Sequence, residues 1–431
     1  MTERGLVSSA REYLLRAGRS RLAGSFAWTV FGQAASWGIR AAYFLILVRT
    51  LPAREYGLFL SVSAMMTALH PFADLGTTNL ILKDTARDPA SLPEALGNAL
   101  AATFAASAAF ILLLMALAPR IFPASVSPGT VAMVAVADIL CMRLAFVLPT
   151  VFQAHDRIRE MNALSTVFFA CKLAAAVLFM ATAPRADART WAGFYLAGSA
   201  LPIAAACVYT LMQFGRPSFS LARLRGGLGE GFHFSLASSA GNLTGDVDKT
   251  MLAKLSSLEA GGAYGVASRI IEFAAMPINA LSVASYGRFF QHGARGARGG
   301  MDYAVRLLPP SILFGSACSA GLFLGAPLLP LILGPGYAES VQILRWLSPL
   351  PLLRSVSAFP GNALSGSGLQ SSRSAIVIAV ALFSIGLNLW AIPRWGWRGA
   401  AATSAASQLL LLLCVWTSLL LSSRREAAAS V

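Results

Sequence analysis

Charged residues interrupt two consecutive apolar runs of this chain, FHFSLASSAGNLTGDVDKTMLAKL at residues 232–255 and GAYGVASRIIEFAAMPINALSVASYG at residues 262–287. Each run is long enough to cross about 30 Å of hydrocarbon as a helix. The charges are Asp246, Asp248, Lys249, Arg269 and Glu272. A charge at the bilayer centre costs about 3 kcal/mol or more, so such residues normally face a protein-lined or water-filled cavity. The two runs therefore predict membrane helices that line half of a transport site.

The composition of the whole chain is that of a membrane protein. Of its 431 residues, 56% are hydrophobic and 12% are charged, a balance that a soluble domain of this size could not bury in one core. The net charge is +15, but the basic residues lie in short clusters between apolar runs, as in cytoplasmic loops. The five cysteines lie in apolar segments without paired spacing. We therefore expect no nucleic-acid partner, no metal site and no other cofactor.

Apolar windows of about 20 residues recur along the chain and predict an all-α polytopic membrane protein with about twelve transmembrane helices. The predicted spans are 24–48, 57–76, 96–117, 129–152, 161–183, 190–213, 232–255, 262–287, 305–325, 341–364, 374–393 and 399–421. The longest connections lie around 214–231 and 325–340, which leaves no soluble catalytic domain between the spans. We therefore expect that the protein is not an enzyme and that it acts within the bilayer.

The distribution of basic residues predicts the orientation of these spans. Residues 1–21 carry five arginines among apolar residues at helical spacing, which predicts an amphipathic segment on the membrane surface. With the N-terminus in the cytoplasm, 19 basic residues outside the spans fall on the inner side and 8 on the outer side. The outer residues are Arg49, Arg54, Arg120, Arg185, Arg189, Lys254, Arg394 and Arg398. Because cytoplasmic loops carry the excess of Lys and Arg, both termini are predicted to be cytoplasmic.

A weak internal repeat divides the spans into two groups of six. A shift of 208 residues places Glu55-Tyr56-Gly57 on Ala263-Tyr264-Gly265, and both tripeptides open an even-numbered span. Six spans in each half give the halves the same orientation, which is a common plan of transporters. We therefore predict two six-helix lobes around a central cavity. The boundaries are an N-terminal lobe at 1–213, a cytoplasmic linker at 214–231 and a C-terminal lobe at 232–431.

Positive charges are in excess inside the predicted spans. With the last three residues at each span end left out, the seven basic residues are Arg40, Arg143, Lys172, Lys249, Arg269, Arg345 and Arg354, and the four acids are Asp138, Asp246, Asp248 and Glu272. Asp246 with Lys249, and Arg269 with Glu272, are three residues apart and can pair on one helix face. Four cations have no acid at helical spacing, namely Arg40, Arg143, Lys172 and Arg354. Only Asp138 and Asp248 remain to pair with these four, so we expect two of them to stay unpaired.

An excess of positive charge in a membrane cavity suits an anionic substrate such as a phosphate or diphosphate, because arginine is a forked donor for such groups. The candidate substrate-binding residues are Arg40, Arg143, Lys172, Lys249, Arg269 and Arg354. The candidates for ion coupling or for pairing between lobes are Asp138, Asp246, Asp248 and Glu272. The 208-residue shift places Asp248 opposite Arg40, which predicts such a pair. For each residue the alternative is a structural salt bridge. No catalytic residue is predicted, because the sequence has no Walker loop, nucleophile elbow or HExxH motif.

Several short motifs occur in a fixed order along nearly the whole chain. They are Arg49-Thr50-Leu51-Pro52-Ala53-Arg54-Glu55-Tyr56-Gly57, Asp74-Leu75-Gly76, Asp248-Lys249, Ala263-Tyr264-Gly265-Val266-Ala267-Ser268-Arg269, Leu333-Gly334-Pro335-Gly336-Tyr337 and Gly396-Trp397-Arg398-Gly399-Ala400-Ala401. With these motifs the chain resembles polysaccharide biosynthesis proteins that flip lipid-linked oligosaccharides of the O-antigen type. Their superfamily also contains the multidrug extrusion antiporters and the lipid II flippase.

The resemblance implies a flippase that moves an undecaprenyl-diphosphate-linked oligosaccharide from the cytoplasmic to the outer leaflet of a bacterial plasma (inner) membrane by alternating access. The expected partners are the anionic polyprenyl-diphosphate-linked glycan, membrane lipids, and polysaccharide polymerase and export proteins. The alternatives are an ion-coupled multidrug exporter and a lipid II flippase. A drug exporter with cationic substrates would favour an acidic cavity, and relatives of the lipid II flippase carry fourteen spans. The basic excess and the twelve spans therefore favour the oligosaccharide flippase.

Overall fold

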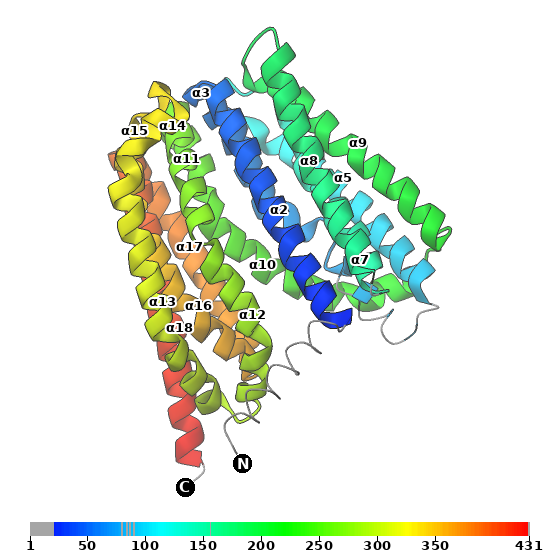
Figure 1. Cartoon of the computed structure of the whole chain (residues 1–431), viewed down its shortest axis with the longest axis vertical. Coiled ribbons are helices and arrows are strands. Elements are labelled where there is room, and N and C mark those ends of the chain that lie inside the picture. The colour runs from blue at the N-terminus through cyan, green and yellow to red at the C-terminus, as the bar shows by residue number, and fades with distance from the viewer. Residues whose placement is uncertain are drawn as a thin grey trace, which may run out of the picture.

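The protein is an all-α bundle in the computed structural model, which describes residues 21–78, 81–82, 85, 88, 91–155 and 157–429 (Figure 1). The α-helices are α2 (Arg21–Thr50), α3 (Ala53–Leu69), α5 (Leu92–Ile121), α6 (Pro128–Ala135), α7 (Met142–Gln153), α8 (Ile158–Thr182), α9 (Ala188–Phe214), α10 (Leu221–Leu255), α11 (Leu258–Ala274), α12 (Met276–Gly293), α13 (Ala297–Gly325), α14 (Leu329–Leu333), α15 (Glu339–Leu347), α16 (Leu350–Gly366), α17 (Gln370–Trp395) and α18 (Trp397–Ala429). A π-helical segment, Val136–Cys141, joins α6 to α7. The amphipathic segment predicted at 1–21 lies almost entirely outside the described residues.

Each predicted span lies on one helix or on consecutive helical segments, except that the end of the span predicted at 57–76 is a turn at residues 73–76. The span predicted at 262–287 is bent, because α11 and α12 meet at 46°. Within the described residues, seven helical segments are long and apolar enough to cross a membrane, or eight when α11 and α12 count as one. The polar helix α10 is not among these seven, and α3 has only 17 residues. The described ends of the chain, Arg21 and Ala429, lie at the same end of the bundle (Figure 1), as an even number of spans requires.

Local sequence signals set the ends of several helices. The side chains of Ser127, Asp187 and Ser257 accept hydrogen bonds from backbone N–H groups in the first turns of α6, α9 and α11. Such caps satisfy donors that a helix leaves without a partner. Glycines with positive φ end other helices, as Gly215 does after α9 and Gly396 does after α17. Inside hydrocarbon every backbone group needs an internal partner, which explains why the spans are helical.

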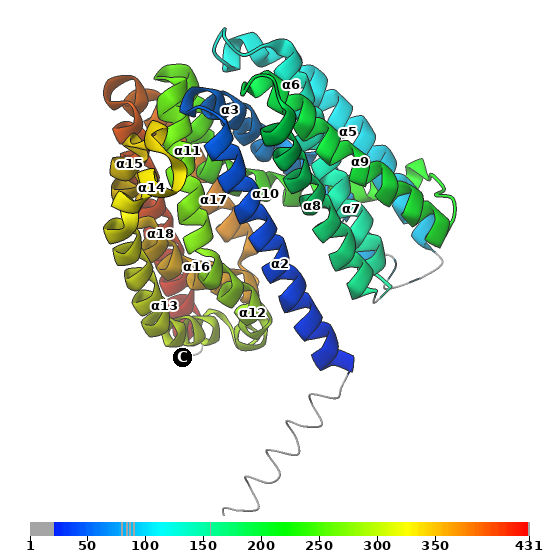
Figure 2. The same cartoon turned by 45° about the horizontal axis from the view of Figure 1, so that its top comes forward.

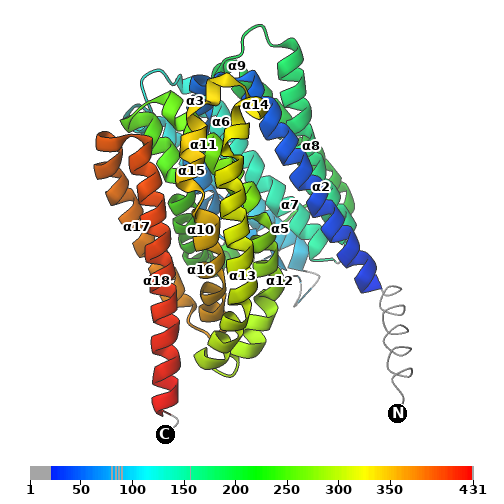
Figure 3. The same ribbon diagram turned by 60° about the vertical axis from the view of Figure 1, so that its left-hand side comes forward.

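The helices form two lobes. In the first lobe α2 packs along α8 and α8 packs along α9, whereas in the second lobe α13 packs on α16 and α17 packs on α18 (Figures 2 and 3). The lobes meet where α3 packs against α10 and α11. The predicted linker at 214–231 is shorter than expected, because α10 already begins at Leu221 and only 215–220 is irregular. This irregular segment is held against α5 by a hydrogen bond from Ser218 N to Pro93 O of 2.9 Å.

The apolar cores differ at the two ends of the bundle. We call the end that contains Arg21 and Ala429 the terminal end and the opposite end the distal end. At the distal end one cluster of buried side chains includes members from both lobes, such as Tyr56 on α3 and Tyr264 on α11. At the terminal end the second lobe has a cluster of its own around Phe289 and Phe359, and the first lobe has separate clusters on α5, α7, α8 and α9. The lobes are therefore joined at the distal end and separate at the terminal end.

Candidate functional site

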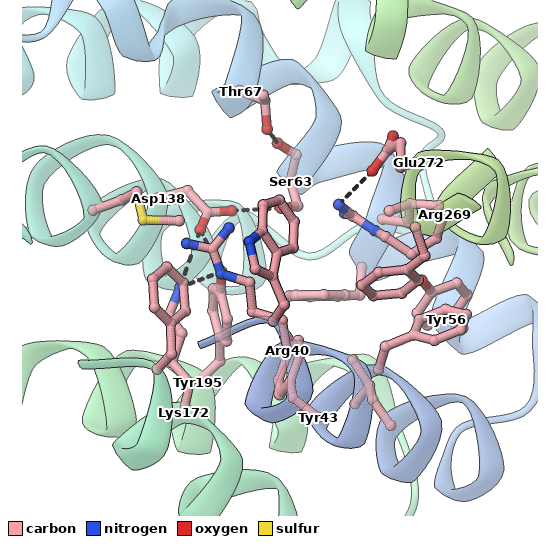
Figure 4. Close-up of a pocket in the computed structure, with 18 of the residues that line it drawn as sticks. Arg40, Tyr43, Tyr56, Ser63, Thr67, Asp138, Lys172, Tyr195, Arg269 and Glu272 are labelled. Atoms are coloured by element: carbon pink, nitrogen blue, oxygen red, sulfur yellow. Dashed lines mark hydrogen bonds and ion pairs between the residues drawn. The ribbon is translucent and has the colours of Figure 1, made fainter. Parts of the chain in front are cut away.

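A cavity of about 280 Å³ lies between the two lobes (Figure 4). Its first wall comes from α2, α3, the π-helical segment, α8 and α9, and its second wall comes from α11 and α12. Three cations and two acids line it, namely Arg40, Lys172, Arg269, Asp138 and Glu272. The cavity wall thus has one positive charge in excess, and three of the six predicted substrate-binding residues are on it.

The first wall holds a hydrogen-bonded cluster around Asp138. One carboxylate oxygen accepts from Tyr195 Oη, and the other accepts from Ser63 Oγ at 2.6 Å. Lys172 Nζ donates to Tyr195 Oη at 2.8 Å and lies 3.9 Å from the Asp138 carboxylate. The lysine side chain is only 5% exposed. Asp138 belongs to the π-helical segment, and π-helical turns are frequent at functional sites because they turn a side chain away from the regular helical face.

Arg40 on α2 is the cavity cation without an acidic partner. Its guanidinium carbon lies 3.7 Å from the ring centre of Phe169 and 5.1 Å from that of Trp37. Its Nε is buried and makes no hydrogen bond to any described residue. Figure 4 shows this side chain between the Asp138 cluster and the Arg269–Glu272 pair. Aromatic faces hold the guanidinium in place by cation–π attraction and leave its N–H donors available to a ligand.

The second wall holds a chain of charges that joins α10 to α11. Arg269 Nη1 donates to Glu272 at 2.8 Å, and Lys249 Nζ lies 3.4 Å from the other oxygen of Glu272 and also pairs with Asp246. Both pairs predicted at helical spacing are therefore present. The Lys249 side chain is 2% exposed and does not line the cavity, whereas Arg269 is 44% exposed and does. Of these two predicted cations, only Arg269 reaches the cavity.

Asp248 lies in a separate polar pocket of about 30 Å³ inside the second lobe, which Arg354 also lines. The carboxylate accepts from Tyr264 Oη at 2.7 Å, from Ser404 Oγ at 3.1 Å and from the backbone N–H of Lys249 at 2.8 Å. All three donors come from the second lobe. The predicted pair of Asp248 with Arg40 is absent from this conformation, because each side chain has its contacts within its own lobe.

Arg143 does not line the cavity, and its acidic partner is neither Asp138 nor Asp248, the two acids expected for it from the sequence. Its guanidinium forms an ion pair with Asp74, whose side chain is fully buried. Asp74 also accepts from the backbone N–H groups of Gly76 and Thr78, each at 3.1 Å, in a turn where Leu75 has a φ of +50°. Asp74 was not counted among the buried acids because it is one of the last three residues of the predicted span 57–76, and it is 69 residues before Arg143. Of the six candidate substrate-binding residues, Arg40 and Arg354 are then the two that form no ion pair with any described residue.

At the distal end the cavity is closed by direct backbone packing of α3 on α11. A Cβ atom at Gly57 would overlap the carbonyl oxygen of Leu258, and one at Gly262 would overlap that of Ala53. Further contacts cross between the lobes nearby, including a hydrogen bond from Thr250 Oγ1 on α10 to Ser61 O on α3 at 2.8 Å. The cavity is thus sealed on the distal side and bounded by separate lobes on the terminal side.

The family sequence model of the polysaccharide biosynthesis proteins matches residues 22–292. The chain belongs to this family. A curated relative, named "Putative O-antigen transporter" in Escherichia coli (strain K12), is 30% identical over 173 residues, which are 40% of this chain. That match spans 42% of the relative, less than half of its length.

Solved structures share the fold of this polysaccharide biosynthesis protein. An inward-facing multidrug resistance MATE family transporter of the MOP superfamily matches with a TM-score of 0.74 and 13% identity, over 91% of this chain and 94% of that chain. The lipid II flippase MurJ in an inward closed conformation matches with a TM-score of 0.72 and 12% identity, over 90% and 87% of the two chains. Family and fold together indicate a multi-pass membrane protein of the polysaccharide biosynthesis family.

The uncharged residues of the cavity could not be identified from the sequence. Tyr195 and Ser63 hold Asp138, and Phe169 holds Arg40, but none of them stands out in an apolar run. A tyrosine inside a span is a weak signal, because its ring also suits lipid or core. These residues could be found only once α3, α8 and α9 were placed around one cavity.

Proposed function

We propose that the protein moves a polyprenyl-diphosphate-linked oligosaccharide from the cytoplasmic to the outer leaflet of the bacterial inner membrane by alternating access. The observation that carries the proposal is the unpaired guanidinium of Arg40 in the cavity between the lobes. Lys172 and Arg269 add two positive charges that Asp138 and Glu272 balance, so with Arg40 the cavity wall keeps one positive charge in excess. A diphosphate compensates the remainder, and guanidinium groups are forked donors for its oxygens.

The uncharged lining of the cavity suits the glycan. Aromatic side chains with polar tips line its first wall, namely Trp37, Tyr43, Tyr56 and Tyr195. Sugar rings have apolar faces and hydroxyl edges, so a wall of this kind packs against the ring and leaves polar groups to orient it. In this proposal the diphosphate lies at Arg40 and Arg269, and the first sugars lie along the aromatic wall.

The six predicted substrate-binding residues receive different roles. Arg40 and Arg269 contact the diphosphate directly. Lys172, which is hydrogen-bonded to Tyr195, contributes positive charge. Lys249 on α10 orients Glu272 through its ion pair. We assign the remaining two to positions away from the substrate, Arg143 to its ion pair with Asp74 and Arg354 to the pocket of Asp248.

Asp248 is the group that we propose for coupling to a proton or a sodium ion. Its carboxylate is buried, no cation among the described residues lies within ion-pair distance of it, and its pocket is large enough for a water molecule or a bare ion. Coupling predicts that Asp248→Asn removes the dependence of transport on pH or on sodium. Normal transport by this variant, with the dependence unchanged, would exclude the role.

The experiment that tests the proposed function uses a strain from which the gene is deleted. Lipid-linked oligosaccharide should accumulate on the cytoplasmic leaflet, out of reach of a membrane-impermeant reagent that modifies glycans. Complementation with the intact gene should return the oligosaccharide to the outer leaflet, where polysaccharide polymerase and export proteins would use it. Normal arrival at the outer leaflet in the deletion strain, together with new sensitivity to cationic drugs, would instead favour a multidrug exporter.

A further inference from the structure

A second basic pocket, which we call the turn pocket, lies at the terminal end where α12 turns into α13. It encloses about 310 Å³ and is lined by His292, Arg295, Arg298, Gly299, Asp302, Tyr303 and Arg306. The turn is fixed to the last helix, because Glu426 on α18 accepts the backbone N–H of Ala297 at 2.9 Å. Gly296, with a φ of +88°, allows the sharp change of direction. The turn pocket therefore has a defined position in the fold and is remote from the cavity between the lobes.

The charges of the turn pocket are not compensated within the protein. Arg295, Arg298 and Arg306 are exposed, and their side chains make no ion pair or hydrogen bond to any described residue. Asp302 is the single acid of the lining and makes no ion pair with any of them. Two positive charges remain in excess. Three guanidinium groups around one hollow are suited to a phosphate group, whose oxygens accept several charge-assisted hydrogen bonds.

The base of the turn pocket is rigid and aromatic. The ring of His292 stacks on that of Tyr303, with 4.6 Å between their centres and 13° between their planes. Tyr303 in turn packs edge-on against Phe289, a fully buried residue of the second lobe's core, at 4.8 Å. Tyrosine is enriched where membrane helices pass through the headgroup layer, because its ring is apolar and its tip is polar. The pocket thus combines a packed aromatic base with an exposed rim of arginines.

The turn pocket is continuous with the lipid-facing surface of α13. Arg306 is nine residues after Ala297, so it lies about 14 Å along the helix at a rise of 1.5 Å per residue. Next to it Val305 is exposed, and one to two turns further along α13 so are Ile312 and Leu313. A ligand with its phosphate in the pocket could therefore lay an acyl chain along these apolar side chains. A soluble phosphate would use only the first part of this surface.

We infer that the turn pocket binds the phosphate headgroup of an anionic phospholipid, with the acyl chains along the exposed face of α13. Basic pockets at the cytoplasmic ends of membrane helices are suited to such headgroups, since the leaflet is itself anionic. Bound lipid would fix α12 and α13 at the membrane surface and so give the second lobe a fixed reference when the lobes move. The inference does not depend on what the cavity between the lobes transports.

The test is a lipid competition with the full-length protein, purified in detergent and examined by native mass spectrometry. Phosphatidylglycerol and phosphatidylcholine of the same chain length are added together. The intact protein should retain phosphatidylglycerol in preference. The variant R295Q/R298Q/R306Q should lose this preference, by roughly fivefold for each arginine and about 100-fold for the three together.

A matched control removes the same charge elsewhere. The variant R159Q/R216Q/R424Q replaces three exposed arginines that do not line the turn pocket, and it should keep the preference. Equal retention of phosphatidylglycerol by both triple variants, or an equal loss in both, would overturn the inference. A third arm adds inorganic phosphate at about 1 mM. Displacement of the lipid from the intact protein by this anion would mean that the pocket selects soluble phosphate, which would also overturn it.

Discussion

The two ends of the interface between the lobes are built from opposite kinds of contact. At the distal end the lobes share one apolar core, and α3 touches α11 through the backbone at Gly57 and Gly262. Toward the terminal end the lobes have separate cores, and the walls that face each other carry Arg40, Asp138 and Arg269. Neutral close packing joins the lobes at one end, and charged cavity walls face each other toward the other end. A cycle of alternating access requires that this arrangement reverse, so the distal contacts must be tight without being permanent.

The largest effect is expected from filling the distal contact. In Gly57→Leu the new side chain meets backbone atoms of α11, which no rotamer can avoid, and overpacking of this kind costs about 3 kcal/mol. A shift of that size changes the ratio of closed to open distal end about 100-fold. Transport should fall by a comparable factor. Ser61→Cys, buried at this interface, should become reactive to a membrane-impermeant thiol reagent in a background without native cysteines.

The control for this variant is Gly386→Leu, at a position on α17 where a Cβ meets no atom within 4 Å. It should transport normally and leave Ser61→Cys protected. If Gly57→Leu also transports normally with Ser61→Cys protected, the backbone contact is not the seal of the distal end.

A smaller effect is expected from removing the free charge of the cavity. Arg40→Ala should slow transport about tenfold or more at normal protein abundance, because one charge-assisted contact contributes roughly 1.5 to 3 kcal/mol. Arg40→Lys should restore part of the rate, since it keeps the charge and loses the fork. Initial rates of flipping in proteoliposomes measure both. Arg185→Ala, in a distal loop, should match the wild type, and equal rates for Arg40→Ala would remove the basis of the cationic cavity.

Arg143 provides the contrast between a paired and a free cation. Arg143→Met leaves Asp74 buried without its partner, which costs roughly 3 kcal/mol and should lower the amount of folded protein several-fold. The double variant Arg143→Met/Asp74→Asn should recover much of this loss, because no lone charge remains. Transport per molecule of folded protein should stay within about twofold of the wild type. A rate per molecule as low as that of Arg40→Ala would mean that Arg143 contacts the substrate after all.

The smallest effect is expected at the rim of the distal end. Arg54 and Glu259 lie 3.5 Å apart across the lobes, and both side chains are 55% exposed. Exposed pairs of this kind contribute less than about 1 kcal/mol. Glu259→Gln should therefore change the transport rate by less than about threefold, and high salt should erase even this difference. A loss as large as that of Gly57→Leu would show that charge, and not backbone packing, holds the distal end closed.

The helices could be predicted from the sequence, because a bilayer allows few alternatives. All twelve apolar windows became helices, and the pairs Asp246 with Lys249 and Arg269 with Glu272 formed as their spacing on one helix requires. The bend between α11 and α12 and the early start of α10 were not predicted. Apolar content gives the position of a span but carries little information about its axis or its exact end.

The sequence by itself determined the fold class and the presence of an unusual excess of buried positive charge, since both follow from residue type and local spacing. Only the tertiary structure decided where each charge lies. It paired Arg143 with Asp74 across 69 residues, hydrogen-bonded Lys172 to Tyr195 in the cavity wall, and gave Arg40 no acidic partner among the described residues. The physical reason is that a helix fixes its own i+3 and i+4 neighbours, whereas a partner on another helix depends on how the helices pack.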